Sequence, residues 1–287
     1  MQCMDIEEIS ITKKPFADSM EKKIDFLGIG INELNVEEFL RCILQYAVFE
    51  KRKFVTYLNA HCFNLAIKDK KYRQILSVSD IVYPDGISIV WAARILGYSL
   101  PERVNAADFF GRFCRETQDR KISLYLLGGS ENTIKKAIER LKANYPRLKV
   151  HGSYNGYFSE NEEIKIIEEI NRQRPHILLL GLGAGRQEKW VFRNLNKLDV
   201  NVVWAVGGLF NLLSGELKRA PRWMIKAGLE WLYRLIQQPN KLWRRYLIGN
   251  TIFIFLVFRE FLRNLYQAKI YYVIKKFMDI CKRYPAL

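Results

Sequence analysis

One acidic residue stands where an apolar segment ends in a turn. Asp85 follows the apolar residues 81–83 and Pro84, and it precedes Gly86. Pro84 restricts the backbone and Gly86 permits a tight turn, so the carboxylate is expected to point out of the end of a strand. A carboxylate placed there can act as a general base that removes a proton from a hydroxyl group. The spacing alone favours a simpler interpretation, in which Asp85 caps the helix that follows.

Two glycine pairs stand at turns between an apolar run and a helical stretch. They are Gly128-Gly129 and Gly207-Gly208. Backbone amides at the start of a helix can hold phosphate oxygens without help from side chains. Neither pair completes the Gly-x-Gly-x-x-Gly pattern of a dinucleotide site. For Gly128-Gly129, close packing of a strand against a helix is at least as good an explanation.

The segment 181–188 gathers three glycines and three polar side chains in the order Gly-Leu-Gly-Ala-Gly-Arg-Gln-Glu. Its glycines, Gly183 among them, let a ligand approach the backbone. Arg186 can neutralise phosphate and Gln187 can read a base or sugar edge, whereas Glu188 suits the N-terminus of a helix. A simple turn from a strand into a helix fits the same residues.

The last quarter of the chain is basic and aromatic. Residues 218–287 hold 15 Lys/Arg against 3 Asp/Glu, and residues 1–217 hold 31 against 27, so most of the net charge of +16 lies in this tail. Arginine with Trp and Tyr is typical of elements that bind anionic lipid. A solvated basic face or a nucleic-acid site has the same composition. The apolar run 246–258 is too short to span a bilayer, and it favours a membrane surface over nucleic acid.

Histidine and cysteine form no recognisable site. The 3 His and 5 Cys are scattered, and no Cys-x-x-Cys or Asp-x-Asp pair lies near the turns described above. We expect neither a bound metal nor a disulfide framework, and the cysteine usage fits a reducing compartment. The N-terminus lacks the apolar region of a secretion signal.

The elements that must position these residues follow from the hydrophobic pattern. With 287 residues, 49% of them apolar, the chain can bury a substantial core and is not disordered. Short apolar runs alternate with amphipathic stretches, which predicts an α/β fold with a Rossmann-like parallel sheet wrapped by helices. In such sheets ligands bind beyond the carboxyl ends of the strands, where all of these turns lie, so we expect one composite pocket. The predicted strands are 24–29, 54–58, 81–83, 123–127, 150–157, 176–180 and 202–206.

The same pattern divides the chain into three parts. Residues 1–22 are polar and predict a loosely ordered arm, residues 23–217 form the α/β core, and residues 218–287 form a basic helical appendage that associates with a membrane. The helical signal of the appendage is continuous from about residue 222. The predicted helices of the core are 36–49, 62–68, 87–96, 107–118, 132–144, 162–172 and 187–194.

From about Ile24 to Tyr246 the chain resembles the WecG/TagA/CpsF family of glycosyltransferases, which build bacterial surface polymers. Each motif alone is weak, but their occurrence together and in the right order is specific. The motifs are Tyr83-Pro-Asp-Gly-Ile-Ser, Glu102-Arg103-Val104 with Asp108, Gly181 to Trp190, Gly207-Gly-Leu-Phe through Gly215, Arg219-Ala-Pro, and Gly228-Leu-Glu-Trp-Leu-Tyr-Arg234.

The resemblance implies an inverting glycosyltransferase that needs no metal or other cofactor. Its donor would be a UDP-sugar, such as N-acetylmannosamine, its uronate or a related hexose. Its acceptor would be a sugar on a polyprenyl diphosphate at the cytoplasmic face of the cell membrane. The implied partners are these two substrates and an anionic membrane surface, without nucleic acid, and a self-associated core is compatible with the residues. Asp85 takes the place of the family's proposed general base.

Two other classes of protein remain as alternatives to the glycosyltransferase. They are a non-catalytic membrane adaptor of a polysaccharide assembly complex and a nicotinamide-dependent oxidoreductase.

Further site positions carry over from the family or from the turns described above. We assign donor binding to Asn59, Thr56, Gly128, Gly129, Gly183, Arg186, Gln187, Glu188, Gly207 and Gly208, and acceptor or diphosphate binding to Arg103, Asp108, Arg219, Arg222, Arg234, Lys241 and Arg244.

Overall fold

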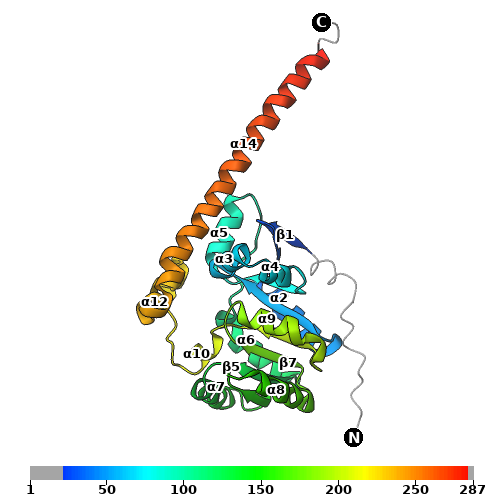
Figure 1. The fold of residues 1–287 in the computed structure, drawn as a ribbon, viewed down its shortest axis with the longest axis vertical. Coiled ribbons are helices and arrows are strands. Elements are labelled where there is room, and N and C mark those ends of the chain that lie inside the picture. Colours follow the sequence, from blue (N-terminus) through cyan, green and yellow to red (C-terminus); the bar gives the residue numbers. More distant parts are fainter. Residues whose placement is uncertain (1–21, 284–287) are drawn as a thin grey trace.

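A computed structural model describes residues 22–283 of the chain, so the arm predicted for 1–22 lies almost entirely outside the described residues. The centre of the fold is a six-stranded sheet with the order β4-β3-β8-β7-β5-β6, and every neighbouring pair is parallel (Figure 1). This confirms the predicted parallel α/β sheet. Its strands are β3 (Lys53–Leu58), β4 (Ile81–Pro84), β5 (Ser123–Gly128), β6 (Lys149–Tyr154), β7 (Ile177–Gly181) and β8 (Val202–Ala205).

Helices cover both faces of this sheet, which is why its central strands are apolar on both sides. Along β7, Ile177 and Leu179 face one core cluster, and Leu178 and Leu180 face the other. The alternation buries every second side chain against a different layer of helices. The helices of the core are α2 (Val36–Phe49), α3 (Ala60–Lys68), α4 (Lys70–Ser77), α5 (Ile87–Ile95), α6 (Ala106–Asp119), α7 (Glu131–Asn144), α8 (Glu160–Gln173), α9 (Arg186–Asn194) and α10 (Leu209–Leu213).

The first predicted strand, 24–29, is wrong, because the chain reverses within it. Strands β1 (Lys23–Phe26) and β2 (Ile29–Asn32) pair antiparallel as a small separate sheet. The two residues between them, Leu27 and Gly28, both have positive φ, 54° and 79°, which is the geometry of a tight hairpin turn. The side chain of Asn32 accepts a hydrogen bond from Val82 N at 2.8 Å and ties the hairpin to edge strand β4.

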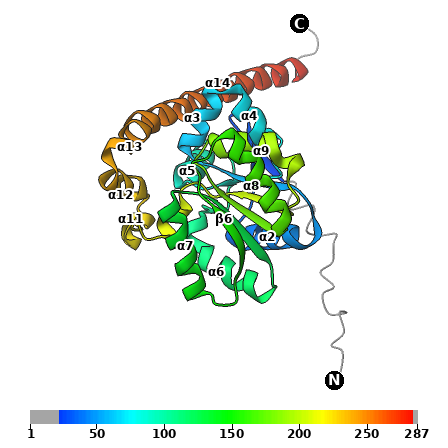
Figure 2. The ribbon, with the colours of Figure 1, turned by 60° about the horizontal axis from the view of Figure 1, so that its bottom comes forward.

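The described part of the tail is mainly helical from Arg222 onward, as predicted, with short breaks at 227–229 and 238. Helix α14 begins beside α3 and α5 and then projects away from the rest of the molecule (Figures 1 and 2). Its first turns are anchored because Phe253 and Val257 are buried, and the Phe253 ring packs on Phe63 with 5.4 Å between ring centroids. The tail comprises α11 (Arg222–Lys226), α12 (Glu230–Gln237), α13 (Pro239–Trp243), a π-helical turn (Arg244–Ile248) and α14 (Gly249–Arg283).

The apolar run 246–258 was predicted to be a buried or interfacial helix, and it forms part of the π-helical turn and the start of α14. Across residues 22–283, none of the helices combines the length and the apolar character that crossing a bilayer requires. Between 259 and 272 the side chains of α14 are mainly exposed, including Leu262, Leu265 and Tyr266.

Candidate active site

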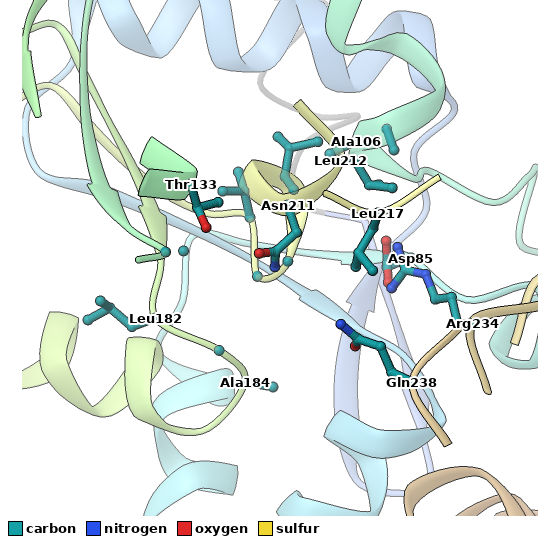
Figure 3. A pocket seen from close by; sticks show the side chains of 18 of the residues that line it. Asp85, Ala106, Thr133, Leu182, Ala184, Asn211, Leu212, Leu217, Arg234 and Gln238 are labelled. Carbon is teal, nitrogen blue, oxygen red and sulfur yellow. The ribbon is translucent and has the colours of Figure 1, made fainter. Parts of the chain in front are cut away.

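A cavity of about 540 Å³ opens at the carboxyl edge of the sheet, where the turns after β3, β4, β5, β7 and β8 meet (Figure 3). We call it the active-site cavity. It is the composite pocket that the sequence predicts, because parallel strands bring their carboxyl ends to one edge. The predicted site residues that line it are Asn59, Asp85, Gly129, Gly183, Arg186, Gly207, Gly208, Arg234 and Lys241.

Asp85 is held at the end of β4 by two side-chain amides. Asn59 Nδ2 donates to Asp85 Oδ2 at 3.1 Å, and Asn105 Nδ2 donates to Asp85 Oδ1 at 2.9 Å. Each carboxylate oxygen therefore has one protein donor and retains a further lone pair for a ligand. The carboxylate is half-buried and faces the active-site cavity.

Helix capping fixes the direction of both amides. Asn59 Oδ1 accepts from the first backbone amides of α3, and Asn105 Oδ1 accepts from Ala107 N at the start of α6. Since each Oδ1 is already engaged, each Nδ2 must point at Asp85. Capping by asparagine is a local sequence preference, so two ordinary helix starts orient the carboxylate. The second interpretation of Asp85, as a helix cap, is wrong: α5 begins after Gly86 without a side-chain cap.

Burial raises the pKa of Asp85 above its ordinary value of 3.8, while the Asn59 hydrogen bond and the Arg234 charge act in the opposite direction. The carboxylate thus becomes a stronger base than a solvent-exposed aspartate. A base whose pKa moves toward neutrality removes protons more effectively at physiological pH.

The tail closes one side of the active-site cavity with positive charge. Arg234 of α12 points at Asp85 (Figure 3), and Lys241 and Arg245 line the same cavity. With Arg186 from the opposite wall, four cationic side chains face two carboxylates, Asp85 and Glu216. Arg245 Nε is buried and has no hydrogen-bond partner among the described residues. This balance favours an anionic ligand.

An ion-pair cluster fastens α12 to the core. Arg103 bonds to Asp108 and, at 2.9 Å, to Glu230 at the start of α12, and Arg219 bonds to the same two carboxylates. The Arg103 and Glu230 side chains are only 13% and 14% exposed. The cluster therefore holds Arg234, one turn further along α12, in its place beside Asp85. Asp108 and Arg219, which were predicted to bind the acceptor, are instead engaged in these ion pairs.

Four predicted donor residues lie behind the cavity wall instead of lining it. Gln187 and Glu188 are fully buried: Gln187 Oε1 accepts from Gly207 N at 3.2 Å, and Glu188 Oε1 accepts from Thr56 Oγ1 at 3.0 Å. They support the glycine turns from below. Gly128 belongs with them: its φ is +143°, and a Cβ there would lie 2.4 Å from the oxygen of Gly181. Only glycine permits this close approach of β5 to β7.

The tail arginines that face the cavity differ in part from those predicted. Arg222 and Arg244, both predicted, are exposed and line neither the active-site cavity nor the groove beside it, and Arg244 lies over the Trp243 ring. Arg245, the second residue of the π-helical turn, lines the cavity instead. Sequence reasoning missed Asn105 as a partner of Asp85, although its position just before a predicted helix start was a usable signal.

A second, apolar groove of about 600 Å³ adjoins the active-site cavity, between α5, α12 and α14. Arg103, the remaining predicted acceptor residue, lines it, as does His61, whose pKa is lowered to about 4 by burial and by the Arg245 charge. Within residues 22–283, no group of three or more His, Cys, Asp or Glu side chains is arranged to hold a metal ion.

The fold and the site define a protein of the α/β class with a half-buried carboxylate in a cationic cavity at the carboxyl edge of a parallel sheet. The sequence pattern of the glycosyl transferase WecG/TagA/CpsF family matches residues 24–267, which is most of the chain. The chain therefore belongs to this family and is a glycosyltransferase, not the nicotinamide-dependent oxidoreductase kept as an alternative.

Individual relatives agree with this assignment. The chain is 30% identical to an N-acetylglucosaminyldiphosphoundecaprenol N-acetyl-beta-D-mannosaminyltransferase of Bacillus subtilis, over 74% of this chain and 82% of that protein. It is 23% identical to the protein of the same name from Staphylococcus aureus strain MW2, over 77% of this chain and 87% of that protein.

Proposed function

We propose that this protein transfers a sugar from a UDP-sugar to a sugar carried on a polyprenyl diphosphate, with inversion at the anomeric carbon and without a metal. The observation that carries the proposal is the placement of Asp85, which is oriented by two amides beside Arg234 in a cationic cavity. The names of the relatives support the class of acceptor and an N-acetylmannosamine-like donor sugar.

The residues divide the chemistry into a base and a set of cations. Asp85 removes the proton of the acceptor hydroxyl as its oxygen attacks C1 of the donor sugar from the face opposite the diphosphate. The bond between C1 and the diphosphate oxygen breaks, and UDP leaves with the electron pair. Charge on the departing diphosphate is stabilised by cationic side chains and by backbone amides of the glycine turns. The cavity supplies that stabilisation through Arg186 and Lys241.

The tail supports placement of the enzyme on an anionic membrane, at the cytoplasmic face where a UDP-sugar is available. Its charge excess of 15 Lys/Arg over 3 Asp/Glu is attracted to anionic lipid. Exposed apolar side chains on α14, including Ile254, Phe255 and Leu262, supply the insertion that charge alone does not.

The experiment is UDP release from a panel of UDP-sugars, measured with and without a polyprenyl-diphosphate-linked N-acetylglucosamine acceptor, in the presence of EDTA. We expect release that requires the acceptor, is greatest with one N-acetylated hexose donor, and is unchanged by EDTA. NMR of the product linkage reports inversion.

Two results would contradict the proposal in different ways. Release that EDTA abolishes would overturn the metal-independent mechanism. Absence of release and of calorimetric binding for every UDP-sugar, in a folded protein that still binds anionic vesicles, would favour the non-catalytic membrane adaptor.

A further inference from the structure

The apolar groove is open, and most of its exposed lining surface is apolar, with its polar residues including those that it shares with the active-site cavity. Four large apolar side chains on its walls are strongly exposed: Trp91 (45%) and Ile95 (55%) on α5, and Ile254 (64%) and Phe258 (56%) on α14. Contiguous exposed apolar surface of this kind marks a site for an apolar ligand or partner. The groove is also lined by Ile87, Ala92, Trp231, Leu247, Phe253 and Val257.

The groove is continuous with the active-site cavity. Asp85, Asn105, Arg234, Arg245 and Tyr246 line both spaces. A ligand lying in the groove therefore reaches the carboxylate of Asp85 without crossing solvent. The two arginines stand at the junction between the polar and the apolar space.

This order of surfaces matches one kind of molecule: a polar head, then a strongly anionic linker, then a long apolar chain. We propose that the groove between α5, α12 and α14 binds the first isoprene units of the lipid-linked acceptor, with the diphosphate at Arg234 and Arg245 and the sugar hydroxyl at Asp85. This rests on the proposed function and adds to it a chain-binding site on the protein itself. The enzyme thereby binds the lipid chain of the acceptor as well as its sugar.

The test compares two exposed phenylalanines on the same helix. Phe258 lines the groove, whereas Phe255 is 63% exposed on α14 and does not line it. We compare Phe258→Ser, Phe255→Ser and, on the opposite wall, Ile95→Ser. Each variant is assayed with two N-acetylglucosamine diphosphates, one with a geranylgeranyl chain in detergent and one with a butyl group in water.

Phe258→Ser and Ile95→Ser should raise the KM for the geranylgeranyl acceptor about tenfold, a loss of about 1.4 kcal/mol in binding. Their KM for the butyl acceptor should stay within about twofold of wild type, and Phe255→Ser should change neither value. Equal effects of Phe255→Ser and Phe258→Ser would mean that α14 acts only through the membrane or micelle, and the proposal would be overturned.

A binding measurement separates this proposal from the proposed function. A geranylgeranyl diphosphate probe carrying a diazirine on its second isoprene unit is photo-crosslinked to the full chain, and the labelled peptides are identified. Label within 87–95 and 247–258, lost in Phe258→Ser, supports the groove even if no sugar is transferred. Label at other positions would overturn the proposal. A dimer in sedimentation that Phe258→Ser dissociates would also overturn it, because the groove would then be buried by self-association.

Discussion

Breaking the Arg103–Glu230 ion pair should loosen α12 and, with it, the cation beside the general base. The two side chains are 13% and 14% exposed and 2.9 Å apart. Charge-assisted hydrogen bonds of this kind contribute about 1.5–3 kcal/mol, and each partner keeps a second contact through Arg219 or Asp108. We therefore expect Arg103→Gln and Glu230→Gln each to lower the free energy of unfolding by about 2 kcal/mol.

The assay is a double-mutant cycle on stability and on activity. A loss of about 2 kcal/mol corresponds to a fall in Tm of about 4–8 °C in a chain of this size, and the coupling energy between the two positions should be about 1–2 kcal/mol. Turnover should fall about tenfold in each variant, because Arg234 is carried by α12. The control is Arg147→Gln, since the Arg147–Asp119 pair is 72% and 59% exposed and should contribute under about 0.5 kcal/mol.

Additive single effects on Tm, with no coupling energy, would refute the claim that this pair fastens α12. So would full turnover in both variants despite the loss of stability, because Arg234 would then hold its position without the cluster.

Three shorter predictions concern the base, the glycine turn and the tail. Asn59→Ser keeps a capping oxygen for α3 but removes the hydrogen bond that lowers the pKa of Asp85. Since the ionised carboxylate is the active base, the acid limb of kcat/KM against pH should move to higher pH. An unmoved acid limb would contradict this. Gly128→Ala should lower the free energy of unfolding by roughly 3 kcal/mol in chemical denaturation, because the new Cβ meets the Gly181 backbone; wild-type stability would contradict the close approach. Removing 262–287 takes away 6 Lys/Arg and 1 Asp but leaves the buried Phe253 in place, so pelleting with anionic vesicles should fall while activity on the butyl acceptor stays within about twofold; undiminished pelleting would place the membrane contact elsewhere.

The sequence predicts the sheet well because its central strands are buried on both faces and therefore appear as apolar runs. The hairpin was missed because Leu27-Gly28 turns the chain within 24–29 and neither turn residue is polar. The turns that hold Asp85 and the glycine pairs were predictable because the carboxyl ends of parallel strands share one edge.

Finer features of the site depend on rotations that no residue pattern records. Arg245 and not Arg244 faces the cavity, and the residue pattern of this basic segment does not distinguish the two arginines. Thr56 lies inside a predicted strand and Gln187 begins a predicted helix, and tertiary contacts bury both of them behind the cavity wall. The position of Asn105 before a predicted helix marks it as a capping residue, but the fold is needed to show that its side chain meets Asp85, twenty residues away.

The central claim is that Asp85 removes the acceptor proton, and its most direct test is single-turnover sugar transfer by Asp85→Asn alongside calorimetric binding of the donor. The account predicts donor affinity within about twofold of wild type, an unchanged fold by circular dichroism, and a transfer rate lower by roughly 10²–10⁴. A transfer rate within about threefold of wild type, with the donor still bound, would contradict the account and remove Asp85 from the chemistry.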